Sequence, residues 1–182
     1  MAGSGLGDYI YKDIDENGKI DAKDMLRSDL NTIPQIVFGL TGNFQYKNFD
    51  LSVLFQGQAL ARLHYTPLQA PLEGNITKEM ATQSWNLDRP DAKYGRINST
   101  NNRKESTMWL RNASFLRLKN VELGYNFSGK ALKTVGVKGL RLYIGGYNLF
   151  TISGLKEVDP ETNNTAAYPL MRVFNTGVKV TF

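Results

Sequence analysis

The stretch DIDENGKIDAKD carries oxygen-bearing side chains at the spacing of an EF-hand-type calcium loop. Asp13, Asp15 and Asn17 alternate along the chain. Gly18 provides a tight turn at the sixth position, and Asp24 stands at the twelfth. Ca2+ takes about six to eight oxygen ligands, and a chain folded around such a turn points the oxygens of alternate residues inward. The candidate metal ligands are Asp13, Asp15, Asn17, Lys19 through its carbonyl, Asp21 through a water molecule, and Asp24.

Two features separate this loop from an EF-hand. Its twelfth residue is Asp24 rather than a bidentate Glu, and the preceding GDYIYK lacks a helical pattern. A single calcium loop of the dockerin-like kind suits these residues better. The alternative is a solvated turn in which Asp and Asn side chains bond their own backbone. Five matching positions favour a structural Ca2+ whose role would be to rigidify the loop.

Residues suited to catalysis are few and lack a recognisable arrangement. The chain has no cysteine, and no nucleophile motif such as GxSxG accompanies its only histidine, His64. Glycine loops that bind nucleotide phosphates are also absent. Asp159 and Glu157 lie in a loop and Glu122 stands alone in a strand, so no defined pair of carboxylates supports glycosidase chemistry. The sequence therefore predicts that the chain is not an enzyme.

Composition and charge narrow the class of protein. The 182 residues include 22 Lys+Arg and 17 Asp+Glu, a net charge of +5. Because the basic residues are scattered rather than interleaved with aromatic residues, we expect no nucleic-acid partner. Aromatic residues at 11% and 17 glycines favour strands and turns. No apolar run approaches the length of a membrane-spanning helix, but a membrane-spanning strand needs only about 9–11 alternating residues.

Alternating apolar and polar residues predict antiparallel strands. IVFGLTGNFQYK and FDLSVLFQ alternate on either side of the turn Lys47–Asn48 and form a hairpin. Further strand patterns occur in SFLRLKNVELGYNF, LRLYIGGYNLF and RVFNTGVKVTF. The apolar phase changes near Lys119, which indicates either a bulge or a strand that passes from one environment into another.

The last strand has one apolar face and one polar face. Its apolar face carries Phe174, Val178, Val180 and Phe182. In a soluble sandwich this face would pack on another sheet, whereas in an outer-membrane barrel it would meet lipid and the polar face would line a wet lumen. Interfacial aromatic girdles could be supplied by Tyr125, Phe127, Tyr143, Tyr147 and Phe174.

Short and long connections alternate along the chain. They are short at Lys47–Asn48 and around Gly129–Lys138, and long at Ala59–Asn112 and Thr151–Tyr168. Outer-membrane barrels have short periplasmic turns and longer external loops. In that orientation Phe182 lies on the periplasmic side and the acidic stretch lies outside.

The first long connection contains a candidate helix and the candidate ligand contacts. TKEMATQSW has the pattern of a short helix. Trp85 and Tyr94 are weak candidates for substrate binding, because aromatic rings stack on sugar faces. Trp109 immediately precedes a strand, and anchoring at the membrane interface suits it better.

Several long segments resemble a known family. They are FDLSVLFQGQ (49–58), WLRNASFLRLKNVELGYNF (109–127), LRLYIGGYNLFTISGLKEVDPE (140–161), the Tyr168-Pro169 pair and the strand ending in Phe182. In this order they resemble the C-terminal part of SusC/RagA-type TonB-dependent outer-membrane transporters. The resemblance runs over nearly the whole chain from Gly7.

The resemblance implies an all-β fold, an antiparallel up-and-down meander that is the C-terminal part of a transmembrane β-barrel with long external loops. It implies import of glycans or peptides across the bacterial outer membrane, with a SusD-like surface lipoprotein as partner. TonB would act through an N-terminal part absent from this sequence. Outer-membrane lipid and the barrel-assembly machinery are further partners, and Phe182 resembles the terminal aromatic residue that this machinery reads.

We expect residues 1–7 to be a tag or arbitrary start, 8–34 an external loop with the calcium site, and 35–182 the barrel strands and loops. The alternative function is a soluble calcium-stabilised carbohydrate-binding β-sandwich. A secreted hydrolase fragment is a more remote one.

Overall fold

The computed structural model describes residues 4–29, 32–65, 76–127, 129, 132, 134, 136–156, 158–162 and 167–182. The chain forms two compact units. The loop unit comprises Met1–Asn31 with Leu63–Arg111, and the sheet unit comprises Thr32–Arg62 with Asn112–Phe182.

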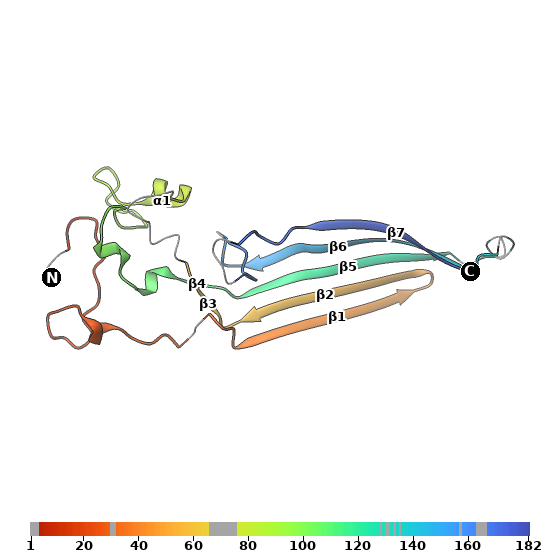
Figure 1. The fold of residues 1–182 in the computed structure, drawn as a ribbon, viewed down its shortest axis with the longest axis horizontal. Coiled ribbons are helices and arrows are strands. Elements are labelled where there is room, and N and C mark those ends of the chain that lie inside the picture. The colour runs from red at the N-terminus through yellow and green to blue at the C-terminus, as the bar shows by residue number, and fades with distance from the viewer. Residues whose placement is uncertain are drawn as a thin grey trace. The chain divides into compact units, whose positions relative to one another are not determined.

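The sheet unit is a five-stranded antiparallel meander (Figure 1). Its strands lie in the order β1 (Ile36–Tyr46), β2 (Phe49–Ala59), β5 (Phe115–Phe127), β6 (Gly139–Ser153) and β7 (Val173–Thr181). A two-residue turn joins β1 to β2, with Lys47 in the left-handed region at φ 52°. The predicted meander is therefore confirmed. Short and long connections also alternate as predicted: a two-residue turn joins β1 to β2, and a long segment that includes Leu63–Arg111 of the loop unit separates β2 from β5.

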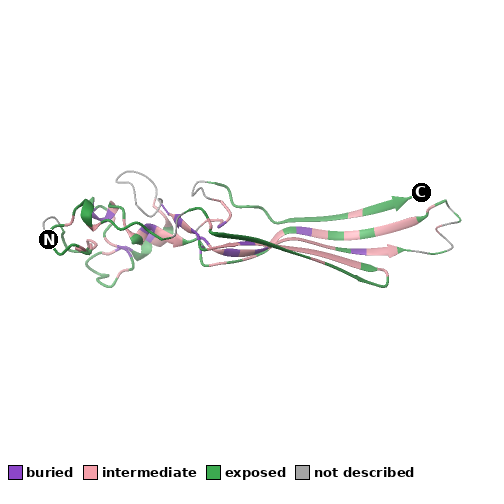
Figure 2. Cartoon of the chain, turned by 90° about the horizontal axis from the view of Figure 1, so that it is seen from below, coloured by how far each residue is buried: buried purple, intermediate pink, exposed green. Residues whose placement is uncertain are grey.

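The strand register collects apolar side chains on one face of the sheet. Phe44 pairs with Leu51, Leu51 with Leu123, and Leu123 with Ile144. Because directly paired residues point to the same face, each such row continues across the strands. Exposed residues dominate the outermost strands, as Figure 2 shows for β1 and β7.

The apolar face is open rather than sealed against a second sheet. Phe174, Val178 and Val180 are 76%, 59% and 41% exposed. A soluble sandwich requires these side chains to lie in its core. Their exposure contradicts the sandwich alternative. It leaves a continuous apolar surface, which is unfavourable in water and favourable against lipid or another apolar surface.

A β-bulge at Lys119 explains the phase change in β5. Leu54 of β2 pairs with Asn120 and the next residue, Phe55, pairs with Leu118, so Lys119 is an extra residue on β5. On the β6 side Leu118 pairs with Phe150 and Asn120 with Tyr147, so Lys119 faces two residues, Asn148 and Leu149. The extra residue keeps the apolar residues on both sides of it on one face. Of the two readings of the sequence, the bulge is the correct one.

The loop unit has short elements around a small core. It contains α1 (Lys78–Gln83) and 3-10 helices at Ala22–Asp24, Asn101–Arg103 and Thr107–Trp109. The short strands β3 (Arg62–His64) and β4 (Leu110–Asn112), most of whose residues belong to this unit, pair in a separate two-stranded sheet. Thr77 caps α1 by accepting a hydrogen bond from Met80 N at 3.2 Å, which confirms the predicted short helix. Buried apolar residues include Leu63, Tyr65, Met80, Tyr94 and Trp109. None of the helices among the described residues has the length and apolar character needed to cross a bilayer.

Two glycines on neighbouring strands give a test of the sheet packing. A Cβ atom at Gly57 would lie 2.5 Å from both Phe115 O and the ring of Phe38, whereas one at Gly39 would be 3.8 Å from Phe55 O. We expect Gly57→Ala to lower the free energy of unfolding by about 1–3 kcal/mol, because a backbone carbonyl must move. Gly39→Ala should cause no loss. Urea unfolding of the detergent-refolded protein measures both, and equal losses would contradict the register.

Candidate functional site

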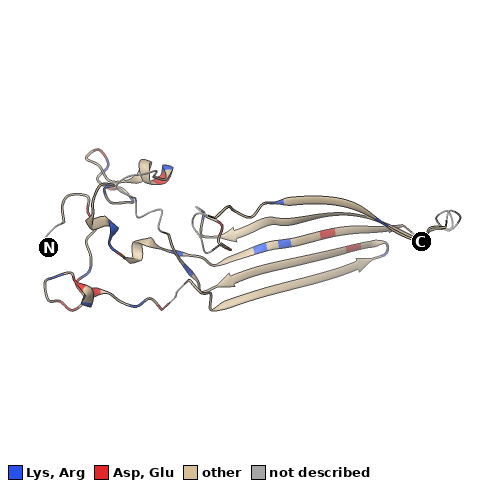
Figure 3. Ribbon diagram, viewed as in Figure 1, with Lys and Arg blue, Asp and Glu red and all other residues tan. Residues whose placement is uncertain are grey.

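The face of the sheet opposite the apolar one carries interacting charges. Arg141 of β6 donates to Glu122 of β5 at 2.8 Å and also pairs with Asp50 of β2. Asn126 Nδ2 donates to Asp50 Oδ2 at 2.7 Å. Figure 3 shows these strands with charges in a sheet that is otherwise mainly uncharged. Glu122, which the sequence pattern leaves alone in its strand, is thus one member of a cluster built from three strands.

A second cluster surrounds Arg117 of β5, whose side chain is 3% exposed. Its guanidinium donates to Asp159 Oδ1 at 2.7 Å, to Glu161 Oε2 at 2.6 Å and to Thr151 Oγ1 at 2.9 Å. Lys119 Nζ donates to the other oxygen of Glu161 at 2.6 Å. The cluster therefore joins β5 and β6 to the connection between β6 and β7. Glu157, the sequence neighbour of this cluster, lies outside the described residues.

Asp159 remains ionised in this setting. Its burial alone would raise the pKa of the carboxyl group. Hydrogen bonds from Glu161 N, Arg117 and Leu170 N outweigh that effect, so the pKa of Asp159 lies below its ordinary value. A polar cavity of about 690 Å³ adjoins the cluster and is lined by Arg117, Thr151, Asp159 and Arg172, among others.

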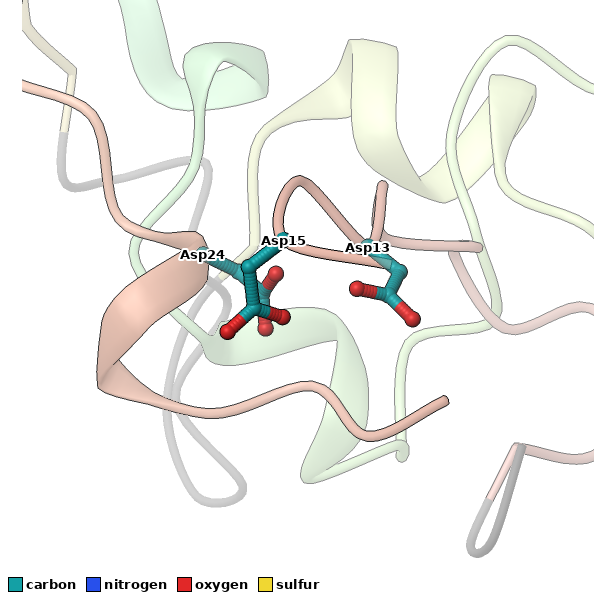
Figure 4. Close-up of side chains that lie close together, drawn as sticks. All are labelled: Asp13, Asp15 and Asp24. Carbon is teal, nitrogen blue, oxygen red and sulfur yellow. The ribbon is translucent and has the colours of Figure 1, made fainter. Parts of the chain in front are cut away.

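The acidic loop brings three of its predicted ligands together. Carboxylate oxygens of Asp13, Asp15 and Asp24 all lie within 4.8 Å of one another (Figure 4). One Ca2+ at roughly 2.3–2.6 Å from each oxygen fits that spacing. Hydrogen bonds from the backbone N–H groups of Asp21 and Ile14 lower the pKa of Asp24, so this carboxyl group is held in its charged form.

Two other predicted ligands, Asn17 and Asp21, make hydrogen bonds within the loop. Asn17 Oδ1 accepts from Lys19 N at 2.8 Å, and Asn17 Nδ2 donates to Asp15 at 2.8 Å. Asp21 caps the 3-10 helix Ala22–Asp24 by accepting from Lys23 N at 2.8 Å. The structure thus groups the carboxylates at positions one, three and twelve, and uses the ninth residue as a helix cap.

Two asparagines hold the segment that precedes this loop. Asn102 Oδ1 accepts from Tyr9 N at 2.7 Å, and Asn102 Nδ2 donates to Gly7 O at 3.2 Å. Asn101 Nδ2 donates to Tyr9 O at 3.1 Å. Both asparagines are buried. Sequence patterns gave no indication of this contact, because its partners are about 90 residues apart and carry no motif.

Asp8 strengthens the same attachment. It pairs with Arg96 at 2.8 Å, and its side chain has no exposed surface. Burial would raise the pKa of Asp8, but hydrogen bonds from Gly5 N and Ser99 and the Arg96 guanidinium lower it to about 2. Residues 1–7 were expected to be a tag or arbitrary start, and the described part of them makes hydrogen bonds from Ser4 onward.

The predicted aromatic contacts have mixed outcomes. Tyr94 is 1% exposed and packs inside the loop unit, which argues against contact with a substrate in this conformation. Trp85 is half-buried and packs against Gly7. Tyr125 makes edge-to-face contacts with Phe49 and with Phe127, each at 4.7 Å between ring centroids, near the short turns as a girdle requires.

Two further aromatic predictions concern Tyr143 and Phe182. Tyr143 lies on the polar face, where the Arg141 guanidinium is 5.2 Å from its ring centroid, so its place in a girdle was wrongly predicted. Tyr143 pairs with Gly177 of β7, and Gly177 lies between Asn175 and Lys179 on the polar face of that strand. Tyr143 therefore points to the polar face as well. Phe182 is 76% exposed, and its role in barrel assembly stays a prediction.

A sheet with one exposed apolar face, one charged face, and alternating short and long connections has the architecture of outer-membrane barrel strands. Known proteins with similar sequences agree with this architecture. No family model matches the chain. TonB-dependent receptor P3 of Formosa agariphila is 29% identical over 200 residues, covering 97% of this chain and 19% of its own length. TonB-dependent receptor SusC of Bacteroides thetaiotaomicron is 28% identical over 193 residues, which cover 96% of this chain and 19% of SusC.

Solved structures agree with this result. The RagAB peptide importer in its closed-closed state superposes with a TM-score of 0.73 at 25% identity, over 90% of this chain and 19% of that one. The RagAB peptide transporter superposes with a TM-score of 0.70 over 91% of this chain and 20% of that one. The predicted resemblance to SusC/RagA-type TonB-dependent receptors is confirmed, and the chain spans about a fifth of the length of these relatives.

Asp8 generates a prediction about acid sensitivity. Its pKa is lowered when folded, so its contribution to stability is complete above about pH 4 and is lost as the pH falls toward about 2. Asp8→Asn should remove this part of the pH dependence, whereas Asp88→Asn, at an exposed position, should leave it unchanged. Thermal unfolding across this pH range measures the effect. Parallel pH profiles for Asp8→Asn and the wild type would contradict the assignment.

Proposed function

We propose that this chain forms part of the wall of a TonB-dependent importer in the bacterial outer membrane. The main support is the two-faced sheet, in which one apolar surface runs across five strands opposite a charged and hydrogen-bonded surface. Lipid would cover the first surface and water the second. Because strands in lipid must satisfy their backbone groups with each other, the paired meander is the element that crosses the bilayer.

The importer would carry glycans or peptides through a passage, without covalent chemistry by this chain. The RagAB peptide importer, to which the chain is similar, supports peptides as cargo, and the similarity to SusC supports the class of TonB-dependent receptor. A SusD-like surface lipoprotein would be the partner at the end with the long connections, and TonB would act through other parts of the protein. Phe182 would serve the barrel-assembly machinery as a recognition residue.

A structural Ca2+ would complete the acidic loop. Support comes from the three carboxylates grouped within 4.8 Å and from the attachment of the preceding segment by Asn101 and Asn102. A cation there would neutralise like charges held close together. Its role would be to hold the loop in one conformation at the outer surface.

Adjacent residues of β1 test the membrane assignment. Leu40 lies on the apolar face and is 66% exposed, while Thr41 lies on the polar face of the same strand. Leu40→Lys should make folding into bilayers less favourable by about 2–4 kcal/mol, because the charge enters the hydrocarbon region. Thr41→Lys should be nearly neutral. Folding yield into liposomes, read by heat-modifiable gel mobility, measures both, and equal tolerance of the two lysines would contradict the assignment.

Two aspartates of the same loop test the calcium site. Asp15→Ala removes a member of the carboxylate group and should weaken Ca2+ affinity by roughly tenfold or more. Asp21→Asn keeps the helix cap, and an affinity equal to that of the wild type would show that Asp21 acts as a cap rather than as a water-linked ligand. Calorimetric titration gives the affinities, and chelation of the wild type should speed proteolysis within residues 8–24. Cleavage that is the same with chelator and with Ca2+ would count against the site.

A further inference from the structure

The connection between β6 and β7 folds back onto the polar face of the sheet. Its described parts, residues 158–162 and 167–172, are called the strap here. Arg117 of β5 binds Asp159 and Glu161 of the strap. Gln58 Nε2 of β2 donates to Pro160 O at 3.4 Å, so the strap reaches across β5 to β2. Pro160 is buried there.

One carboxylate organises both limbs of the strap. Asp159 Oδ1 accepts from Arg117 and, at 3.0 Å, from Glu161 N. Asp159 Oδ2 accepts at 3.1 Å from Leu170 N on the returning limb. Its backbone carbonyl accepts from Thr162 N at 3.1 Å and from the Thr162 hydroxyl at 2.9 Å. Asp159 therefore ties the outgoing limb, the returning limb and the sheet together.

Burial makes this arrangement sensitive to the loss of one partner. The side chains of Arg117 and Asp159 are 3% and 7% exposed, and those of Lys119 and Glu161 are 27% and 23% exposed. Two cations balance two carboxylates, so the cluster carries no net charge. Removing Arg117 would leave Asp159 without its cation and Glu161 with Lys119 alone, in a place that water reaches poorly.

We propose that Arg117 is a latch that keeps the strap folded across the polar face, and that an intact latch narrows the passage lined by that face. The effect on the passage depends on the function proposed above, whereas the latch itself depends only on the contacts within the sheet unit. Arg141 provides the contrast, because its partners Asp50 and Glu122 both lie on strands and hold no part of the strap.

A single introduced thiol can report on the strap, because the chain has no cysteine of its own. Leu155 is 5% exposed and lines the cavity beside the latch. In the assembled protein in detergent, Leu155→Cys should react slowly with a maleimide. Adding Arg117→Met should raise the labelling rate by about tenfold or more. Adding Arg141→Met, which breaks ion pairs on the same face, should leave the rate near that of the parent.

Asp159→Asn provides a milder second test if Arg117→Met does not fold. It keeps the shape of the side chain but removes its charge, and it should also raise the labelling rate. Arg117→Lys should give an intermediate rate, because the charge remains while the paired hydrogen bonds are lost. Unchanged labelling in Arg117→Met and Asp159→Asn would overturn the latch, and so would an equal rise in Arg141→Met. Failure of Leu40→Lys to disturb membrane folding would overturn the proposed function instead.

Discussion

The pairing register of the five strands is the constraint on which the rest of the sheet unit depends. Each strand alternates only locally, and it is the register that brings Phe44, Leu51, Leu123 and Ile144 into one row on one face. Because the side-chain period of a strand is two, a shift by one residue would exchange the two faces of that strand. A correct register therefore decides at once which surface meets acyl chains and which meets water. The charged clusters around Arg117 and Arg141 are consequences of it, since their members come from different strands.

The two charged clusters on the polar face link different elements of the sheet unit. Arg141 joins carboxylates of neighbouring strands and so braces the sheet itself, near the short turns. Arg117 is more deeply buried and binds carboxylates of a connection. Ion pairs of the second kind are costly to break, because the remaining carboxylate keeps little contact with water. The ion pairs of Arg117, which restrain a connection, are therefore less exposed to water than the ion pairs of Arg141, which link strands.

Much of the sheet unit could be predicted from the sequence because its signals are local. Strand alternation, the Lys47–Asn48 turn and the unequal connection lengths depend on neighbouring residues, and the structure reproduces them. Spacing also predicted that Asp13, Asp15 and Asp24 come together, while Asp21 caps a 3-10 helix and the bound cation stays a prediction. Contacts between distant residues could not be predicted. Asn102 with Tyr9, and Arg117 with Asp159, combine ordinary residue types whose pairing only the folded chain defines. Tyr143 was misplaced because an aromatic residue suits either face when a cation covers its ring.

The bulge at Lys119 also limits how the gene can change. Upstream of it the apolar positions of β5 are even-numbered, at Leu116 and Leu118, and downstream they are odd-numbered, at Val121 and Leu123. Loss of the single codon for residue 119 would restore an unbroken alternation and would leave the apolar residues of both halves on one face, whereas loss of the codon for Glu122 would turn one half of β5 inside out against its neighbours. Most codons in the long connections can be gained or lost at little cost. Deletions within β5 should therefore be accepted at the bulge, where Lys119 has no partner on β2, and purged where paired residues would exchange faces.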